Sequence, residues 1–516
     1  MTETPHSTTA ATYEFDPPRE GLRARTRKGA IATALGQGLD ILIEIGPIVV
    51  LSRLLPPSDF GVMAMAMAVG AILAVVKEAG LSSATVQARQ LNHEQVNALF
   101  WTNVLLGLSV GALSFIAGPT AAWVVSQPQL TWIIPCLGLT GIIDCFGIQH
   151  DALLQRKLEF RKIVTRQLTA RSLGVAAGIT AALYGAGIWS LVIMQAVSAI
   201  TGTVTLWIAC GWRPGRPSNL AAARPLVRFG VNILLERLLG QTTRGMDTLV
   251  IGYFHGSVAT GLYARAQGLI GKPLARVLAP IMNVSRPALS RAADDPQRFE
   301  QAAADVLSLV SVFTALIVAV LASASDGIVR LLLGPAWSAA VPIFSALAIF
   351  AMVEPCASIM ASLVIAAGRP DALLRWRMIS VVIVLTGLLL SAPYGVVVIA
   401  YAYAGLGLAV RMPAFLWYGC RAAGLPFGKL FHTIWPPVLS GAIAVGASHA
   451  LRTQFDDPAT PLAAVALGAT AAAVYLGVCL ALPRTRQSLW LLAEQIAPRL
   501  RQRSAGKPNS EPATTT

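Results

Sequence analysis

Basic side chains recur within an otherwise apolar stretch of the chain, between Arg228 and Arg291. A charge at bilayer depth costs roughly 2.5 to 3.5 kcal/mol on insertion scales, so such residues normally face a bundle interior or a water-filled cavity. Guanidinium and ammonium groups in a cavity can bind an anion. The candidate anion-binding residues are Arg237, Arg244, Arg265, Lys272 and Arg276.

The spacing of these residues places them on shared helix faces. A helix over residues 228–253 places Arg237, Gln241 and Arg244 on one side, at steps of four and three. In the next helix the remaining basic candidates recur at intervals of seven and four residues, and none has an acidic partner within that helix. This face is a candidate basic wall of a cavity. The alternative is that these long side chains extend to the headgroup region.

The composition predicts an all-α, polytopic membrane protein. Of the 516 residues 55% are hydrophobic and 13% are charged, whereas soluble domains have about 25% charged residues. Fourteen apolar segments each meet, or come close to, the length of about 20 residues that one membrane span needs. They cover residues 31–52, 59–79, 96–117, 130–150, 163–184, 188–210, 228–253, 257–286, 302–323, 338–366, 375–391, 395–418, 429–450 and 461–482.

The charge distribution orients these spans. With the N-terminus inside, the inner segments hold about 25 Lys and Arg residues and the outer segments about three, the bias that the positive-inside rule describes. The even number of spans places both termini in the cytoplasm. The net charge of +15 therefore reflects membrane topology and does not indicate a nucleic-acid partner. The six cysteines lie in apolar segments without metal-ligand spacing, and we expect no metal or cofactor.

An internal repeat divides the chain into two halves. The sequence Gly-Val-Met-Ala-Met-Ala from Gly61 returns as Gly-Leu-Tyr-Ala-Arg-Ala from Gly261, an offset of about 200 residues or six spans. Because six is even, we expect two lobes of the same topology, related by an axis along the membrane normal. The predicted parts are a basic N-terminus (1–28), an N-lobe (29–210), a linker (211–225), a C-lobe (226–420), two extra spans (427–482) and a cytoplasmic tail (483–516). The tail fits either an amphipathic helix on the membrane or a plain cytoplasmic helix.

The first predicted span carries acidic residues on a polar face. Gln37, Asp40 and Glu44 follow one another at steps of three and four. The repeat pairs this span with the one that contains Arg237 and Arg244, so we expect the acidic face to lie opposite the basic one. Asp40, Glu44 and Asp247 are then candidates for binding a coupling ion. The alternative is that the charges form internal salt bridges that hold the lobes together.

Several short motifs resemble bacterial polysaccharide exporters. They are Gly80–Gln87, Phe100-Trp101, Arg156–Arg161, Gly187–Val192, Trp212-Arg213-Pro214, Asp247–Gly252, Gly261–Tyr263 and Pro287–Ser290. In order and spacing, over about residues 25–420, the chain is similar to flippases of the multidrug/oligosaccharidyl-lipid/polysaccharide exporter superfamily, in the branch of colanic acid and related capsule exporters. The resemblance implies two six-helix lobes, usually with two extra helices, around a central cavity lined by helices 1, 2, 7 and 8. The loop motifs would mark the fold and would not contact the ligand.

The resemblance also implies a function. It predicts flipping of a polyprenyl-diphosphate-linked oligosaccharide across the bacterial inner membrane, with polysaccharide polymerase machinery as a further partner. The basic candidates would receive the diphosphate. Sugars need hydrogen-bonding side chains and aromatic faces, and candidates are Gln37, Gln241, Tyr263 and Gln267, although Tyr263 equally fits a packing role.

Two other functions compete with this interpretation. A cation-coupled drug antiporter of the same superfamily would bind a cationic ligand, which the basic residues of the eighth span would repel. A non-transporting scaffold of a glycan assembly complex has no use for charges along several facing helices. We do not expect an enzyme, because the sequence has no nucleotide-binding glycine loop, metal cluster or nucleophile–base pair.

Overall fold

The computed structural model describes residues 22–77, 82, 85–86, 91–217, 224–482 and 485–486. Within these ranges it describes the backbone alone for residues 22–32, 34–35, 76–77, 224–239, 242–244, 284 and 286. All regular elements in the described residues are helices, so the predicted all-α class is confirmed. The chain divides into two compact units. Unit 1 extends to Arg265 and includes Arg330–Ala340 and Leu388–Val398, and unit 2 comprises Ala266–Val329, Val341–Gly387 and the chain from Ile399.

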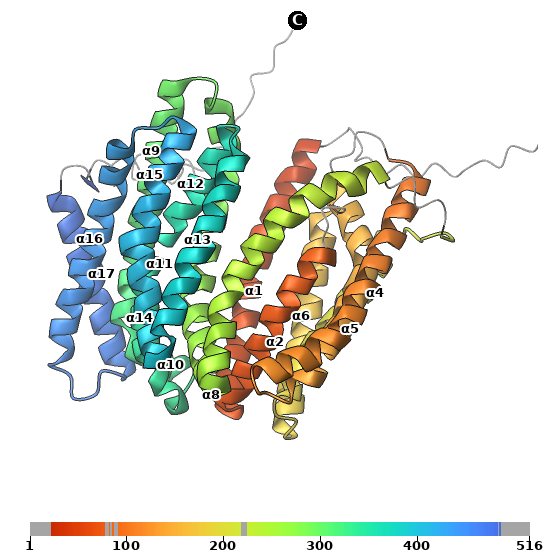
Figure 1. Ribbon diagram of the computed structural model, residues 1–516, viewed down its shortest axis with the longest axis horizontal. Coiled ribbons are helices and arrows are strands. Elements are labelled where there is room, and N and C mark those ends of the chain that lie inside the picture. The colour runs from red at the N-terminus through yellow and green to blue at the C-terminus, as the bar shows by residue number, and fades with distance from the viewer. Residues whose placement is uncertain are drawn as a thin grey trace, which may run out of the picture. The chain divides into compact units, whose positions relative to one another are not determined.

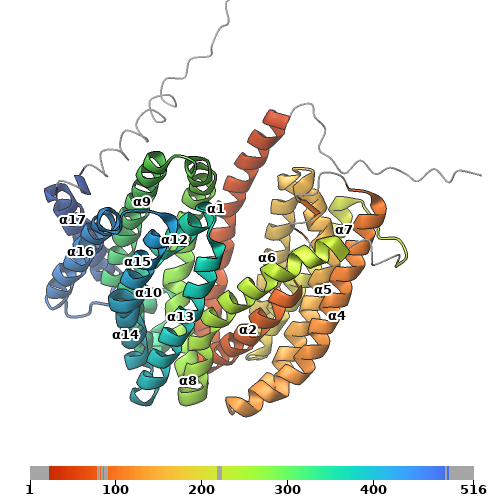
Figure 2. The same ribbon diagram turned by 45° about the horizontal axis from the view of Figure 1, so that its top comes forward.

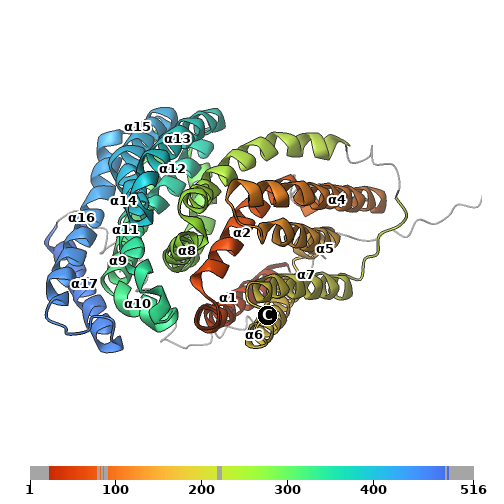
Figure 3. The same ribbon diagram turned by 60° about the horizontal axis from the view of Figure 1, so that its bottom comes forward.

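Unit 1 is a bundle of long helices (Figure 1). Its helices are α1 (Leu22–Leu54), α2 (Pro57–Lys77), α4 (His93–Val124), α5 (Leu130–Arg156), α6 (Phe160–Leu183) and α7 (Trp189–Cys210). Helix α4 packs against α5, α6 against α7, and α5 against α7, as the view along the bundle shows (Figure 3). Helix α2 packs on both α4 and α5, and α1 packs on α6. The charged α1 is therefore held beside another charged helix, α6.

A kink divides the long segment α8 (Arg224–Ala292) into two helices. Gly256 at the kink has φ 72° and ψ −170°, a conformation that glycine adopts without steric cost. We name residues 224–255 the first arm and residues 257–292 the second arm. The predicted boundary between the spans 228–253 and 257–286 is confirmed by this break. The second arm begins in unit 1 and continues into unit 2 after Arg265.

Unit 2 contains the remaining helices. They are α9 (Pro296–Ser323), α10 (Ser325–Leu332), α11 (Val341–Ala351), α12 (Glu354–Ala366), α13 (Pro370–Ser391), α14 (Val396–Leu406), α15 (Met412–Ala423), α16 (Phe427–Arg452) and α17 (Pro461–Ala481). The last residues of α10 and α13 and the first residues of α14 belong to unit 1. Three short elements complete the fold: the 3-10 helices η2 (Pro335–Ala340) and η3 (Ala392–Tyr394), which belong to unit 1, and the π-helical turn η4 (Gly407–Arg411) in unit 2. Helices α16 and α17 lie side by side, and both pack on α9 (Figure 2).

Each of the fourteen predicted spans overlaps a helical segment of the described residues, although the span 338–366 is interrupted by a turn at residues 352–353. Ten helical segments in the described residues are long and apolar enough to cross a membrane, which confirms a multi-pass membrane protein. The other predicted spans correspond to α1, α6 and the two arms of α8, which are helical but more polar. The number of membrane-crossing helices therefore stays a prediction. The four polar helices are also those that carry most of the charges at the candidate site.

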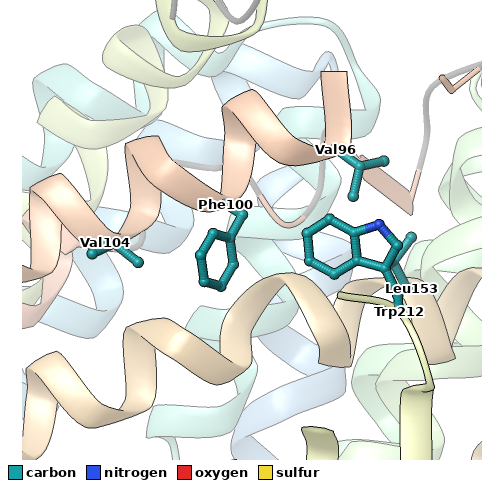
Figure 4. Packing of buried hydrophobic residues seen from close by; sticks show 5 residues of the cluster. All are labelled: Val96, Phe100, Val104, Leu153 and Trp212. Carbon is teal, nitrogen blue, oxygen red and sulfur yellow. The ribbon is translucent and has the colours of Figure 1, made fainter. Parts of the chain in front are cut away.

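Aromatic residues fix one end of unit 1, where two of the loop motifs meet. Trp212 is buried against Phe100 of α4, with ring centroids 5.8 Å apart, in a cluster with Val96, Val104 and Leu153 (Figure 4). The indole Nε1 of Trp101 donates a hydrogen bond to the carbonyl oxygen of Gly215 at 2.9 Å. These contacts attach the start of the linker to α4, which supports the interpretation of both tryptophan motifs as fold markers.

Candidate functional site

The first arm of α8 carries two of the predicted basic residues. Arg237 and Arg244 belong to its helical backbone, but their side chains lie outside the described residues. Gln241, between them, is half-buried. The basic face predicted for this arm therefore stays a prediction, and the geometry of the site rests on residues on either side of Gly256.

The two glycines of the internal repeat meet in unit 1. A Cβ atom added at Gly61 would lie 1.7 Å from the carbonyl oxygen of Ser257. A Cβ added at Gly261 would lie 1.9 Å from the carbonyl oxygen of Pro57. The offset of 200 residues that relates the glycines also relates the residues they touch. The repeat thus brings the starts of α2 and the second arm together in a reciprocal crossing, and only glycine allows backbones to approach so closely.

This crossing positions Arg265 over the ring of Phe60. The guanidinium carbon lies 3.8 Å from the ring centroid, and Phe60 in turn packs edge-on against Trp337 at 5.3 Å. The Nε atom of Arg265 is buried without a hydrogen-bond partner among the described residues, and no carboxylate in that part of the chain lies within ion-pairing distance. A ring binds the face of a guanidinium group, and the group's N–H donors point outward from its edge. The guanidinium group of Arg265 is therefore held by an aromatic ring, and the described residues leave N–H donors of this group without an acceptor.

Tyr263 faces the protein interior, which corrects the predicted sugar contact. Its side chain is fully buried, and its hydroxyl donates a hydrogen bond to Oδ2 of Asp247 at 3.0 Å. The backbone N–H of Thr248 donates to the other carboxylate oxygen of Asp247 at 2.8 Å. This contact ties the first arm of α8 to the second across Gly256. Tyr263 thus fills the packing role that was its alternative, because its hydroxyl is occupied and its ring is not accessible to a sugar.

The rest of the second arm lies in unit 2. Lys272 is exposed, and Arg276 and Gln267 are half-buried. The backbone from residue 257 to 292 is helical, and the shared basic face that the spacing predicts for Arg265, Lys272 and Arg276 stays a prediction. The diphosphate and sugar roles of these residues stay predictions.

Asp40 and Glu44 share an ion partner that the sequence analysis missed. The guanidinium of Arg171 in α6 lies 2.6 Å from Asp40 Oδ1 and 3.9 Å from Glu44 Oε2. The partner that the structure describes is on the neighbouring helix. The expectation that the acidic face lies opposite Arg237 and Arg244 stays a prediction, because the side chains of these two arginines lie outside the described residues. A signal was present, because Arg171 is a charge near the middle of the predicted span 163–184. Gln37, on the same face of α1, is exposed.

We expect Arg171→Gln to destabilise unit 1 by about 1 kcal/mol or more, above the usual range for exposed ion pairs. The change removes the cation that lies between two carboxylates one helical turn apart, so their repulsion is less compensated. Thermal unfolding of the purified protein in nanodiscs measures the effect. The double variant Asp40→Asn/Arg171→Gln should recover part of the loss. Purely additive effects of the two substitutions would contradict an energetic coupling between them.

Comparisons with known proteins agree with this architecture. A family profile described as "Polysaccharide biosynthesis protein" matches residues 50–342. The chain is 24% identical over 356 residues to the lipopolysaccharide biosynthesis protein WzxC of Escherichia coli K12, covering 68% of this chain and 72% of that protein. It is 26% identical over 382 residues to the succinoglycan biosynthesis transport protein ExoT of Rhizobium meliloti, covering 74% and 77%.

Solved structures share the fold. The lipid II flippase MurJ in an inward closed conformation superposes with a TM-score of 0.68 at 12% identity, covering 88% of this chain and 98% of that chain. An inward-facing multidrug resistance MATE family transporter of the MOP superfamily superposes with a TM-score of 0.58 at 14% identity, covering 75% and 95%. The fold is thus similar to those of MurJ and the MATE family transporter. Since the family profile matches more than half of the 516 residues, the chain belongs to the polysaccharide biosynthesis protein family.

Proposed function

We propose that this protein moves a polyprenyl-diphosphate-linked oligosaccharide across the bacterial inner membrane by alternating access, for exopolysaccharide, capsule or lipopolysaccharide biosynthesis. Family membership supports a role in polysaccharide biosynthesis, and the name of ExoT describes a transport protein. The observation that carries the proposal is Arg265, a largely buried cation without a carboxylate partner among the described residues. Placing such a charge within the membrane costs free energy, and charges at this depth generally mark functional sites, here the binding of a ligand.

The chemistry of the cargo explains this requirement. A diphosphate cannot cross hydrocarbon alone, because removing its water without replacement is prohibitively costly. Fixed guanidinium groups replace part of that hydration and contact phosphate oxygens through two parallel N–H bonds. The prenyl chain can remain in the bilayer while the headgroup and sugars pass through the protein. No covalent step is needed, so the protein acts as a transporter and not as an enzyme.

The other candidate residues have roles in this proposal. Arg237, Arg244, Lys272 and Arg276 extend the diphosphate path beyond Arg265. The amides of Gln37, Gln241 and Gln267 contact sugars, and the carboxylates of Asp40, Glu44 and Asp247 respond to a coupling ion. The proposed lobes are residues 29–210 and 226–420, and both termini are cytoplasmic, as the distribution of basic residues favours.

A reconstituted transport assay tests the proposal directly. The purified protein is placed in liposomes with an undecaprenyl-diphosphate-linked oligosaccharide, and an impermeant glycosidase outside cleaves only outer-leaflet sugars. Without the protein, we expect the glycosidase to cleave only the fraction of the oligosaccharide that starts in the outer leaflet. With the protein, we expect the cleaved fraction to rise toward all of it. Failure to move any lipid-linked oligosaccharide, together with extrusion of cationic dyes, would favour the drug antiporter. Failure with both would favour the scaffold.

We expect Arg244→Ala and Lys272→Ala each to abolish surface glycan while the protein still inserts in the membrane. Each substitution removes one cation from the proposed diphosphate path and leaves the apolar surface of its helix intact. Surface glycan is measured in a deletion strain that carries each variant, and immunoblots of membrane fractions confirm insertion. Normal glycan from both variants would remove these two residues from the path.

A further inference from the structure

Arg411 places a positive charge near the middle of a membrane-crossing segment of unit 2. The segment Val396–Ala423 is continuous helical structure and apolar enough to span a bilayer. At a rise of 1.5 Å per residue, Arg411 lies about 22 Å along the axis from Val396 and about 18 Å from Ala423. A hydrocarbon core is about 30 Å thick, so neither interface is close to its Cα. An ionisable residue at such depth indicates a functional site by default.

The backbone at Arg411 is unusual. Gly407–Arg411 forms a π-helical turn, in which the N–H of Met412 donates to the carbonyl oxygen of Gly407. Single π-turns inside α-helices are frequent at functional sites. The ring of Phe350 in α11 packs directly on this turn, because a Cβ added at Gly407 would lie 2.3 Å from the ring. Glycine at this position therefore allows Phe350 to approach the π-turn that ends at Arg411.

Two aromatic rings hold the guanidinium group. Its central carbon lies 4.5 Å from the ring centroid of Phe350 and 5.3 Å from that of Tyr403. The two rings meet edge to face at 5.7 Å, and Nη1 of Arg411 donates a long hydrogen bond to the Tyr403 hydroxyl at 3.5 Å. No carboxylate in the described part of the chain lies within ion-pairing distance of Arg411. The aromatic contacts thus fix the cation without neutralising its charge.

Basic residues near helix ends of unit 2 behave differently. Lys429 pairs with Glu300 at 2.7 Å, and Arg452 pairs with Asp326 at 2.7 Å. Arg421 lies 5.8 Å over the ring of Trp417, but it sits in the last turn of α15, where the headgroup region is within reach. Arg411, in contrast, lies near the middle of its span, contacts two aromatic rings, and has no counter-charge among the described residues.

We propose that Arg411 binds an oxyanion, so that unit 2 contains an anion-binding site of its own on α14–α15, separate from the residues of α8. This inference rests on the proposed function, because the expected oxyanion belongs to the transported lipid-linked glycan. Its source is either the diphosphate or the carboxylate of an acidic sugar. Both present oxygen pairs that a guanidinium group contacts through two N–H bonds. The π-turn and the two rings hold that group in position before the anion arrives.

Anion binding by the full-length protein in nanodiscs tests this proposal. The probes are inorganic pyrophosphate and glucuronate, and the apparent Kd of each comes from the rise of the thermal midpoint with probe concentration. We expect Arg411→Met to weaken binding of at least one probe about tenfold, which corresponds to the loss of one charge-assisted contact. Arg411→Lys, which keeps the charge without the planar fork, should give a smaller loss. The probe that responds identifies the source of the oxyanion.

Arg421→Met is the matched control, because it removes an arginine with an aromatic contact from the same helix near its end. We expect it to change both Kd values less than twofold. Should Arg411→Met not fold, Arg411→Lys carries the comparison. The proposal is overturned if the wild type binds neither probe, or if the Arg411 variants that fold bind both within twofold of the wild type. If binding depends on Arg411 but liposomes show no transport of lipid-linked oligosaccharide, the site stands and the proposed function fails.

Discussion

Replacing Gly61 with alanine is expected to destabilise unit 1 by about 3 kcal/mol, at the upper end of the usual range for overpacking. The added methyl group would lie 1.7 Å from the carbonyl oxygen of Ser257. A backbone oxygen in a helix cannot rotate away as a flexible side chain can, so α2 and the second arm of α8 must separate. Their separation also displaces Phe60 and Arg265, and we expect glycan export to be lost. Thermal unfolding in nanodiscs and surface glycan measure the two effects.

A substitution at Gly261, the repeat partner of Gly61, tests the same crossing, and two glycines elsewhere in these helices serve as controls. Gly261→Ala should cost about as much as Gly61→Ala, and the double variant should cost much less than their sum, because either methyl group already opens the same crossing. Gly70→Ala in α2 and Gly268→Ala in the second arm place a methyl group in open space. Both should be neutral or slightly stabilising, since alanine favours helix over glycine. Additive losses for the first pair, or equal losses for all four variants, would contradict the close crossing.

The helices themselves were predictable from the sequence because helix formation in a membrane depends on local composition. Long apolar runs and the short polar links between them predicted fourteen segments, and each overlaps a helical segment of the described residues. The boundary at Gly256 followed from the same reasoning, since a polar link with glycine separates the two runs. The repeat predicted that Gly61 and Gly261 occupy equivalent positions. It could not predict that they touch, because a repeat relates positions in the sequence and does not specify distances.

The candidate site was less predictable because spacing identifies a helix face and not its neighbour. The face that contains Asp40 and Glu44 was predicted, but its partner Arg171 lies on α6, which only packing determines. Tyr263 has the chemistry of a sugar contact, yet its hydroxyl is bonded to Asp247. Arg411 was not predicted as a site residue, because it directly follows the uncharged run Met378–Val410 inside the predicted span 395–418. Both arginines lie inside predicted spans: Arg411 is the one charge in 395–418, and Arg171 shares 163–184 with Arg166.

Arg265→Met is expected to reduce transport by about tenfold to a hundredfold, the range for losing one or two charge-assisted hydrogen bonds to phosphate. Methionine retains an unbranched side chain that can pack on the Phe60 ring. Arg265→Lys keeps a point charge but loses the planar fork, so it should retain partial activity. Phe60→Leu keeps the cation and removes the ring that orients it, and its loss should also be partial. Initial rates in the liposome assay measure these differences.

Stability distinguishes a functional role of Arg265 from a structural one. A buried charge without a counter-charge lowers the stability of the fold, so removing it should raise the free energy of unfolding. Loss of the cation–π contact lowers that free energy by about 1 kcal/mol. We therefore expect Arg265→Met to unfold at about the same temperature as the wild type or at a higher one. Arg213→Met is the matched control in unit 1, because Arg213 lies 5.6 Å over the ring of Trp207 at one end of the bundle. It should transport normally. A variant at position 265 that folds stably but does not transport supports a role of Arg265 in binding the ligand. A variant that is unstable, but transports when it is assayed at low temperature, would mean that Arg265 only supports the fold.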